Sequence, residues 1–271
     1  MTILAVLITA YKAERTIEKT LDSLCKNKEP HDIYIVDDGS PVPLEDVLSP
    51  RDNVTILRSS VNLGVALARN LGLKTILAKD YAYVAFIDAD DKASADRLER
   101  QRVFLDQHPE IGLVGGWGRV VSEAGETLFH LHPPQDHKAI LKCLSYNNCF
   151  LQPSLMFRAD LFRQHGDYRN DYPSAEDYEI VRRFLQYTKA ANIQDYLLIY
   201  TISSQGISQT KRYEQLRSRL KVQLTYCDLF SVHTYLGICK SIALYLLPDV
   251  LVCSLKRHLK GYDSRVRCHK L

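Results

Sequence analysis

Short apolar runs recur through the first third of the chain, and each ends at polar or turn-forming residues. Runs of about four to eight aliphatic and β-branched residues bounded in this way are typical of buried strands. Four segments have this pattern, namely residues 3–9, 32–37, 54–58 and 83–88. The intervening segments 14–27 and 64–79 instead repeat apolar side chains at helical spacing, as at Ile17, Leu21 and Leu24.

Strand and helix signals therefore alternate, which predicts an α/β fold with a mostly parallel sheet flanked by helices. In such a sheet, ligands bind beyond the carboxyl ends of the strands. Short glycine-containing strands follow from about residue 111, and a helix is predicted at 176–187 with Ser174 as its N-cap. Amphipathic helical sequence begins near residue 210, so we expect a C-terminal helical extension.

Charge divides the chain at the same place. The whole chain has 35 basic and 32 acidic residues, of which twelve and four fall in residues 209–271. This gives the extension a net charge of +8 and leaves −5 for residues 1–208. A basic, apolar helical segment of this kind is suited to an anionic membrane surface, or to packing on the acidic part of its own chain.

Cysteine usage and hydropathy indicate the compartment. The seven cysteines form no C-x-x-C pair and lie mostly in apolar segments, which favours reduced thiols in the cytoplasm. The apolar N-terminal run is short and lacks a basic start, so we interpret it as a first strand rather than a signal peptide. Near the C-terminus, Lys240, Pro248 and Asp249 interrupt the apolar sequence before it reaches the roughly 20 residues of a membrane-spanning helix.

Three carboxylates follow the fourth predicted strand in the sequence FIDADD. Asp88 ends the strand and Asp90 lies two residues on, so both can reach one point in space. Turn or helix-cap roles are the alternative for each of them, and for Asp91 in particular. Two converging carboxylates repel each other unless a cation lies between them, and Mg²⁺ or Mn²⁺ with diphosphate oxygens fits such a pair. The chain has no G-x-x-x-x-G-K-[ST] or G-x-G-x-x-G loop, so a metal ion would carry the phosphate recognition.

A second acidic strand end is VDDGS at residues 36–40. Asp38 and Gly39 are suited to a plain turn, which is the alternative to a binding role. Asp37 would accept a hydrogen bond from the ring N–H of a nucleobase, while Tyr11 stacks on the base and Thr9 donates to a carbonyl.

These motifs together resemble family 2 glycosyltransferases with the GT-A fold. The resemblance rests on VLITAYKAERTIEKTLDSL, IYIVDDGS, NLGVALARNLGL, FIDADD and AEDYEIVRRF, in that order, and covers about residues 2–205. It implies a GT-A catalytic domain at 1–208, with a nucleotide-binding half at 1–110 and an acceptor-binding half at 111–208, followed by the extension at 209–271. It also implies inverting transfer of a sugar from a nucleoside-diphosphate donor, usually UDP-linked.

The resemblance assigns roles to individual residues. It places Thr9, Tyr11, Asp37 and Asp38 around the base, with Arg69 near the nucleotide. Asp88 and Asp90 fall at the ribose, the diphosphate and a Mn²⁺ or Mg²⁺ ion. For Arg69, a helix-surface ion pair with an acidic neighbour is the alternative.

Inversion in one displacement requires a base beside the acceptor hydroxyl. The resemblance assigns that role to Asp177 in AEDYE, and Glu176 is its rival. Acidic residues in a first helical turn also complement the helix dipole, which is the structural alternative for both. The acceptor would be a glycan or a lipid-linked glycan of a cell-surface polysaccharide or lipopolysaccharide. The enzyme would then work at the cytoplasmic face of the inner membrane, bound peripherally through residues 209–271.

Several other functions compete with this one. A sugar-1-phosphate nucleotidyltransferase should carry a glycine-rich basic loop where this chain has TAYKAER. A glycoside hydrolase would not need VDDGS, and a non-catalytic nucleotide-sugar-binding or membrane-surface scaffold would not need Asp177. The basic residues do not line the predicted site, so the sequence predicts no nucleic-acid partner. His130, His132 and Trp117 are also notable, and we interpret the two histidines as loop residues beside prolines rather than metal ligands.

Overall fold

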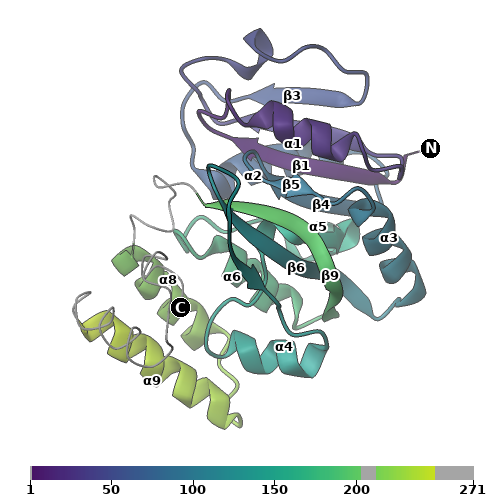
Figure 1. Ribbon diagram of the computed structural model, residues 1–271. Coiled ribbons are helices and arrows are strands. Elements are labelled where there is room, and N and C mark those ends of the chain that lie inside the picture. The colour runs from purple at the N-terminus through teal and green to yellow at the C-terminus, as the bar shows by residue number, and fades with distance from the viewer. Residues whose placement is uncertain (1, 203–211, 248–271) are drawn as a thin grey trace.

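The computed structural model describes residues 2–202 and 212–247 (Figure 1). Within these ranges one sheet contains the strands β1 (Leu4–Ala10), β2 (Asp32–Asp37), β3 (Val54–Arg58), β4 (Tyr83–Asp88), β5 (Lys92–Ala93), β6 (Ile111–Ser122), β7 (Thr127–Leu131), β8 (Met156–Arg158) and β9 (Lys189–Ile202). Their order is β3-β2-β1-β4-β8-β6-β9-β5, and β7 pairs with β6.

The sheet is parallel through β3, β2, β1 and β4, and again between β6 and β9. The short strand β8 joins these two parts and is antiparallel to both β4 and β6. The predicted α/β fold with a mostly parallel sheet is therefore confirmed. All four strands predicted in the first part of the chain are present, with boundaries that agree to within one residue.

Helices cover both faces of the sheet. They are α1 (Ile17–Leu24), α2 (Val65–Leu77), α3 (Arg97–Gln107), α4 (His137–Leu144), α5 (Ala159–His165), α6 (Glu176–Phe184), α8 (Arg212–Thr225) and α9 (Val232–Leu246), with short 3₁₀ turns η1 (Leu44–Asp46) and η2 (Gln152–Ser154). Side chains alternate along β1, so that Val6 and Ile8 pack with α1 and α3, whereas Leu7 packs with α2 and α6. Each such buried side chain contributes about 1.5–3 kcal/mol to folding.

The start of α6 differs from the sequence prediction. Its N-cap position is Ala175, which makes no side-chain capping bond. Ser174 has a left-handed backbone (φ 59°), and its hydroxyl donates instead to Glu214 on α8 at 2.7 Å. The prediction that Ser174 caps this helix is therefore wrong, because its hydroxyl donates to the carboxylate of Glu214 and does not accept from a backbone N–H of the first helical turn.

The C-terminal helices α8 and α9 lie side by side outside the sheet (Figure 1). Helix α8 packs against α6, and α9 packs on α8. Helix α9 also crosses close to the end of α4. A Cβ atom on Gly237 would lie 1.7 Å from the carbonyl oxygen of Ser145, so this crossing requires glycine. Residues 203–211 and 248–271, which include much of the predicted basic extension, lie outside the described residues. None of the described helices is long and apolar enough to cross a bilayer.

Candidate active site

The carboxyl ends of β1, β2 and β4 lie level with one another. Ala10 pairs with Asp37 on β2, and Thr9 pairs with Asp88 on β4. Thr9, Asp37 and Asp88 are therefore brought to one edge of the sheet, as the sequence predicts. Tyr11 follows directly and is 46% exposed, which leaves its ring accessible at this edge.

Asp37 and Asp38 both shape the loops at this edge. Asp37 is fully buried, and its carboxylate accepts from the backbone N–H of Ser40 (2.9 Å) and of Leu44 (3.2 Å) and from Arg58 (2.5 Å). Burial opposes ionisation, but these hydrogen bonds outweigh it and lower the pKa of Asp37.

Asp38 accepts instead from the backbone N–H groups of Leu63 (2.8 Å) and Gly64 (3.0 Å), just before α2. The turn role considered for this motif is therefore present at both aspartates. Contact of either residue with a nucleobase stays a prediction.

The sequence DADD at residues 88–91, here called the DADD turn, holds three carboxylates in different positions. Asp91 is fully buried; its Oδ1 accepts from the backbone N–H of Thr201 on β9 at 2.8 Å, and its backbone carbonyl accepts from Thr20. It thus fastens the turn to α1 and β9. Asp88 is 36% exposed at its side chain, and Asp90 is partly exposed. Burial, followed by the neighbouring charge of Asp88, raises the pKa of Asp90 to about 6.

Arg69 connects this turn to the first turn of α6. Its guanidinium donates to Glu176 at 3.1 Å and lies 3.8 Å from the carboxylate of Asp88, with the ring of Tyr168 beneath it at 5.2 Å. Burial alone would lower the pKa of Arg69, but the surrounding acidic groups outweigh it and raise the pKa. Arg69 is therefore a buried bridge inside the site rather than a surface residue of α2.

Asp177 and Glu176 differ in their partners. Glu176 is buried and paired with Arg69; burial, followed by the neighbouring Asp177 charge, raises the pKa of Glu176. Asp177 is partly exposed, and its two oxygens accept from the side chain of Asn148 (2.9 Å) and from the backbone N–H of Tyr178 (2.8 Å). Of the two carboxylates, Asp177 is thus the one oriented by neutral donors and accessible to a ligand.

A sequence profile described as "Glycosyl transferase family 2" matches residues 5–166. The chain belongs to glycosyltransferase family 2. It is 25% identical over 235 residues to an uncharacterised glycosyltransferase of Haemophilus influenzae, covering 82% of this chain and 72% of the relative. It is 32% identical over 133 residues to the O-antigen biosynthesis glycosyltransferase WbnJ of Escherichia coli, covering 48% of this chain and 51% of WbnJ.

Solved structures show the same fold. Staphylococcus aureus TarS 1–349, crystallised with UDP-GlcNAc, matches with a TM-score of 0.68 at 21% identity, covering 95% of this chain and 77% of TarS 1–349. The mannosyltransferase PcManGT of Pyrobaculum calidifontis, crystallised with GDP-Man and Mn²⁺, matches with a TM-score of 0.64 at 17% identity, covering 92% of this chain and 71% of PcManGT. The GT-A fold predicted for this glycosyltransferase is therefore confirmed.

The donor set of the glycosyltransferase fits a hard divalent cation at the DADD turn. Asp88 and Asp90 present carboxylate oxygens that are partly accessible, whereas Asp91 is turned into the protein. In residues 2–202 and 212–247 no group of three or more His, Cys, Asp or Glu side chains is arranged to hold a metal. Two protein carboxylates, with water and diphosphate oxygens in the remaining positions, match the coordination that Mg²⁺ prefers.

Four residues near the candidate site were not predicted from the sequence. Asn148 holds Asp177, and Tyr200 on β9 lies close enough to the carboxylates that burial and then their charges raise its pKa. Arg97 is fully buried below the DADD turn and donates to the carbonyl of Phe86 at 2.7 Å; burial lowers the pKa of Arg97 to about 10.

The fourth is Arg219 on α8, which is 6% exposed. Burial lowers its pKa, and the nearby Tyr178 and Asp177 oppose that shift. The C-terminal helix pair thus brings a positive charge near the predicted base. Arg97 lies four residues before the buried Gln101, and Arg219 lies three residues from the buried Leu216, so helical spacing places both arginines on the buried face of their helices and is the signal that could have found them.

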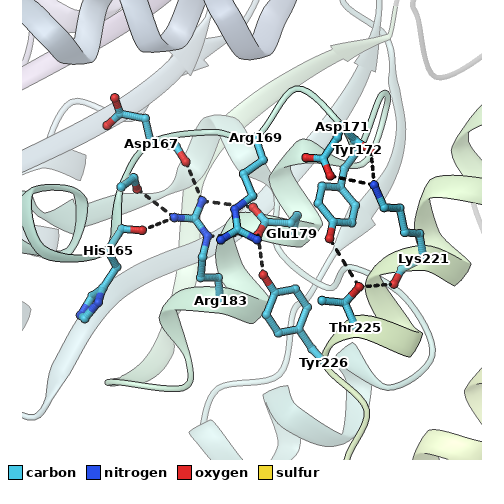
Figure 2. A network of polar contacts seen from close by, with 11 residues as sticks. His165, Asp167, Arg169, Asp171, Tyr172, Glu179, Arg183, Lys221, Thr225 and Tyr226 are labelled. Carbon is cyan, nitrogen blue, oxygen red and sulfur yellow. Dashed lines mark hydrogen bonds and ion pairs between the residues drawn. The ribbon is translucent and has the colours of Figure 1, made fainter.

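A buried polar network holds α6, and with it Asp177, in place (Figure 2). Glu179 is fully buried and forms a two-pronged pair with Arg183, at 3.0 and 3.1 Å. Tyr226, just beyond α8, donates to the same carboxylate at 2.5 Å, and Arg169 lies 3.6 Å from it. Arg183 also donates to the backbone carbonyls of residues 165–167. The network therefore joins α6, the loop before it and the end of α8.

We predict that Asp90→Asn stabilises the metal-free glycosyltransferase at neutral pH. The pKa of Asp90 is about 6 in the folded state and 3.8 ordinarily, so the stability cost of ionised Asp90 grows from about pH 4 and is complete above about pH 6. The variant should gain about 1–2 kcal/mol at about pH 7.5 in chelator, and the gain should vanish below about pH 4. Urea unfolding at both pH values measures this.

The exposed Asp52→Asn serves as the control, with no pH-dependent gain expected. An Asp90→Asn gain that persisted unchanged at low pH would show that ionised Asp90 is not what costs stability.

Proposed function

We propose that the chain is an inverting, metal-dependent glycosyltransferase that moves a sugar from a nucleoside-diphosphate donor, UDP-linked in the first instance, to a hydroxyl of a glycan or glycolipid. The observation that carries the proposal is the Arg69 bridge, because it places the DADD turn beside the first turn of α6. The carboxylates of Asp88 and Asp90, which suit a diphosphate-bound cation, thus lie in one site with Asp177, which suits deprotonation of an acceptor.

The proposed reaction uses the residues as follows. Asp177 takes the proton of the acceptor hydroxyl as its oxygen bonds to the anomeric carbon, while the bond from that carbon to the diphosphate breaks. Asn148 and the N–H of Tyr178 hold the two oxygens of Asp177 and so fix the orientation of this carboxylate. A Mn²⁺ or Mg²⁺ ion on Asp88 and Asp90 would supply Lewis-acid stabilisation to the departing diphosphate.

The nucleoside would lie at the ends of β1 and β2. Tyr11 has an accessible ring for stacking, and Thr9 lies beside Asp88 in the sheet. Asp37 and Asp38 would contact the base or fix the loops that do, and Arg69 would neutralise part of the donor charge. In this division residues 1–110 bind the nucleotide, residues 111–208 bind the acceptor, and residues 209–271 form the extension.

A nucleotide-sugar panel tests the proposal. We expect a UDP-sugar to raise the melting temperature of the purified chain only when Mn²⁺ or Mg²⁺ is present, with GDP- and dTDP-sugars tested beside it. PcManGT was crystallised with GDP-Man and Mn²⁺ and TarS with UDP-GlcNAc, so both nucleotides belong in the panel. Slow metal-dependent hydrolysis of the same donor would accompany the shift. Absence of any metal-dependent shift with every nucleotide would exclude the proposal.

The acceptor would belong to a cell-surface polysaccharide or lipopolysaccharide, made at the cytoplasmic face of the inner membrane. Relatives named for polysaccharide synthesis support this setting, including the O-antigen biosynthesis glycosyltransferase WbnJ of E. coli and TuaG of Bacillus subtilis, named for teichuronic acid biosynthesis. The exposed turn between α8 and α9 and the adjoining helix support contact with a lipid surface through Leu229 (67% exposed), Phe230 (99%), Val232 (70%) and Leu246 (74%).

We predict that Leu229→Ser with Phe230→Ser weakens binding to vesicles of phosphatidylglycerol and phosphatidylethanolamine by at least about tenfold, because two apolar side chains no longer enter the interface. Both side chains are exposed, so folding should be unaffected. Vesicle co-sedimentation measures the change, with Val61→Ser (60% exposed) as the matched control. Equal sedimentation of the double variant and the control would count against membrane contact through this turn.

A further inference from the structure

Four aromatic rings gather on one face of three neighbouring strands, and we call them the aromatic platform. They are Trp117 on β6, His130 on β7, Tyr196 on β9 and His132 directly after β7. The ring centroids of Trp117 lie 4.5 Å from His132 and 5.6 Å from Tyr196, and those of His130 and Tyr196 are 5.0 Å apart. The interpretation of both histidines as loop residues was thus wrong for His130, because β7 extends the sheet to it.

The platform is open to solvent and lies on the α6 side of the sheet. His130 and His132 are exposed, and Tyr196 is 37% exposed. Side chains alternate along β6, so Trp117 shares a face with Gly115, whose Cβ would meet Phe150. Phe150 belongs to the core that contains Tyr178, the residue after Asp177. The platform and the proposed base therefore lie on the same side.

Strands β6 and β9 lead from the platform to the DADD turn. Strand β9 is irregular beside Trp117 and Gly118, so Tyr196 shares the face of Trp117, whereas Tyr200 packs with Leu198 on the opposite face. Tyr200 is within electrostatic reach of Asp88, Asp90 and Asp177. At the end of β6, the charge of Glu123 acts on Asp90. Strand β6 therefore leads from the platform toward the DADD turn.

The chemistry of the platform suits a sugar ring. Sugars have apolar C–H faces and hydroxyl edges, and amphipathic rings offer a flat apolar surface with polar atoms at the rim. The Nε2 atom of His132 and the hydroxyl of Tyr196 already share a hydrogen bond of 2.8 Å, which orients both groups. The nearby Asp195 is paired with Arg100 at 2.7 Å, so the negative charge of Asp195 beside the platform is balanced.

We propose that Trp117, His130, His132 and Tyr196 form a subsite for a sugar ring of the acceptor, away from the hydroxyl that reacts at Asp177. This proposal rests on the proposed glycosyltransferase function. Among the described residues, no third His, Cys, Asp or Glu completes a metal-ligand group with the two histidines.

The single tryptophan makes the proposal directly testable. Trp117 is the only tryptophan of the chain, so tryptophan emission reports on the platform alone. The full chain is titrated with maltotriose, cellotriose and triacetylchitotriose, with UDP and Mn²⁺ present. We expect at least one trisaccharide to give a saturable change in emission and to protect Trp117 from quenching by acrylamide. If none of the three does either, the subsite is overturned.

Variants separate ring contact from a structural role. Tyr196→Ala and His132→Ala should weaken trisaccharide binding and raise the acceptor KM about tenfold, whereas Tyr196→Phe keeps the ring and should stay within about threefold. Hydrolysis of the donor and nucleotide affinity should not change in any of them. The matched control is Tyr187→Ala, which removes another exposed tyrosine, one that stacks on His165 at 3.7 Å.

Two results distinguish failure of the subsite from failure of the enzymatic proposal. If Tyr196→Ala binds the trisaccharide and uses the acceptor as well as the control does, while donor hydrolysis is normal, the subsite is overturned and the transferase proposal stands. If no nucleotide sugar is bound or hydrolysed, the transferase proposal fails, and the emission titration still decides whether the platform binds a saccharide.

Discussion

Asp177→Asn is expected to lower the rate of sugar transfer by about 10²–10⁴-fold, the usual contribution of a general base, while nucleotide affinity stays within about twofold. The substitution keeps the shape of the side chain and its bond to the N–H of Tyr178, but it removes the acceptor for the hydroxyl proton. Transfer is measured with the donor found in the thermal-shift panel, and nucleotide affinity by calorimetry with UDP and Mn²⁺.

The control for this experiment is Asp160→Asn, which changes an exposed carboxylate on α5 (71% exposed at its side chain) and should leave transfer unchanged. Transfer by Asp177→Asn at close to the original rate would remove Asp177 from the role of base. Glu176→Gln would then be the next variant, since Glu176 lies in the same turn and is held by Arg69.

Arg183→Met is expected to lower the free energy of unfolding by about 3 kcal/mol. It leaves the fully buried carboxylate of Glu179 without its two-pronged partner, and removing one member of a buried ion pair typically costs about 3–5 kcal/mol. We place the loss at the lower end because Tyr226 and Arg169 still contact Glu179. Urea unfolding followed by circular dichroism measures it.

A double variant shows whether the uncompensated charge is the cause. Glu179→Leu together with Arg183→Met should recover more than half of the loss, because both charges are gone. Arg100→Met, which breaks pairs with the exposed Asp96 and Asp195, should cost less than about 1 kcal/mol. A double variant no more stable than Arg183→Met would show that packing of the arginine, rather than the charge, is what matters.

The hydrophobic pattern was sufficient to predict the first half of the fold. Period-two and helical spacing are local properties, and the strands at residues 32–37, 54–58 and 83–88 need only such local information. Parallel pairing then brings the strand ends to one edge, so the neighbourhood of Thr9 and Asp88 follows from topology alone. This part of the site could be predicted from short motifs.

Long-range partners could not be predicted in this way. Ser174 donates to a residue 40 positions later in the chain, and Arg183 donates to a carbonyl 18 positions earlier. Asp91 accepts from a backbone N–H 110 positions later. Arg219 illustrates the limit, since its burial beside Asp177 depends on how α8 packs on α6. A helix pattern specifies which face of a helix is apolar, but not which element covers it.

Gly237 offers a way to recognise this helix packing in other sequences. Any larger residue would overlap the carbonyl oxygen of Ser145, so α9 can cross the end of α4 at this distance only with glycine at the contact. A relative that carries a bulky residue at the aligned position must hold its last helix farther out or direct it elsewhere. Comparing this one position across the family would therefore separate proteins that keep the docked helix pair from those that have rebuilt their C-terminal region.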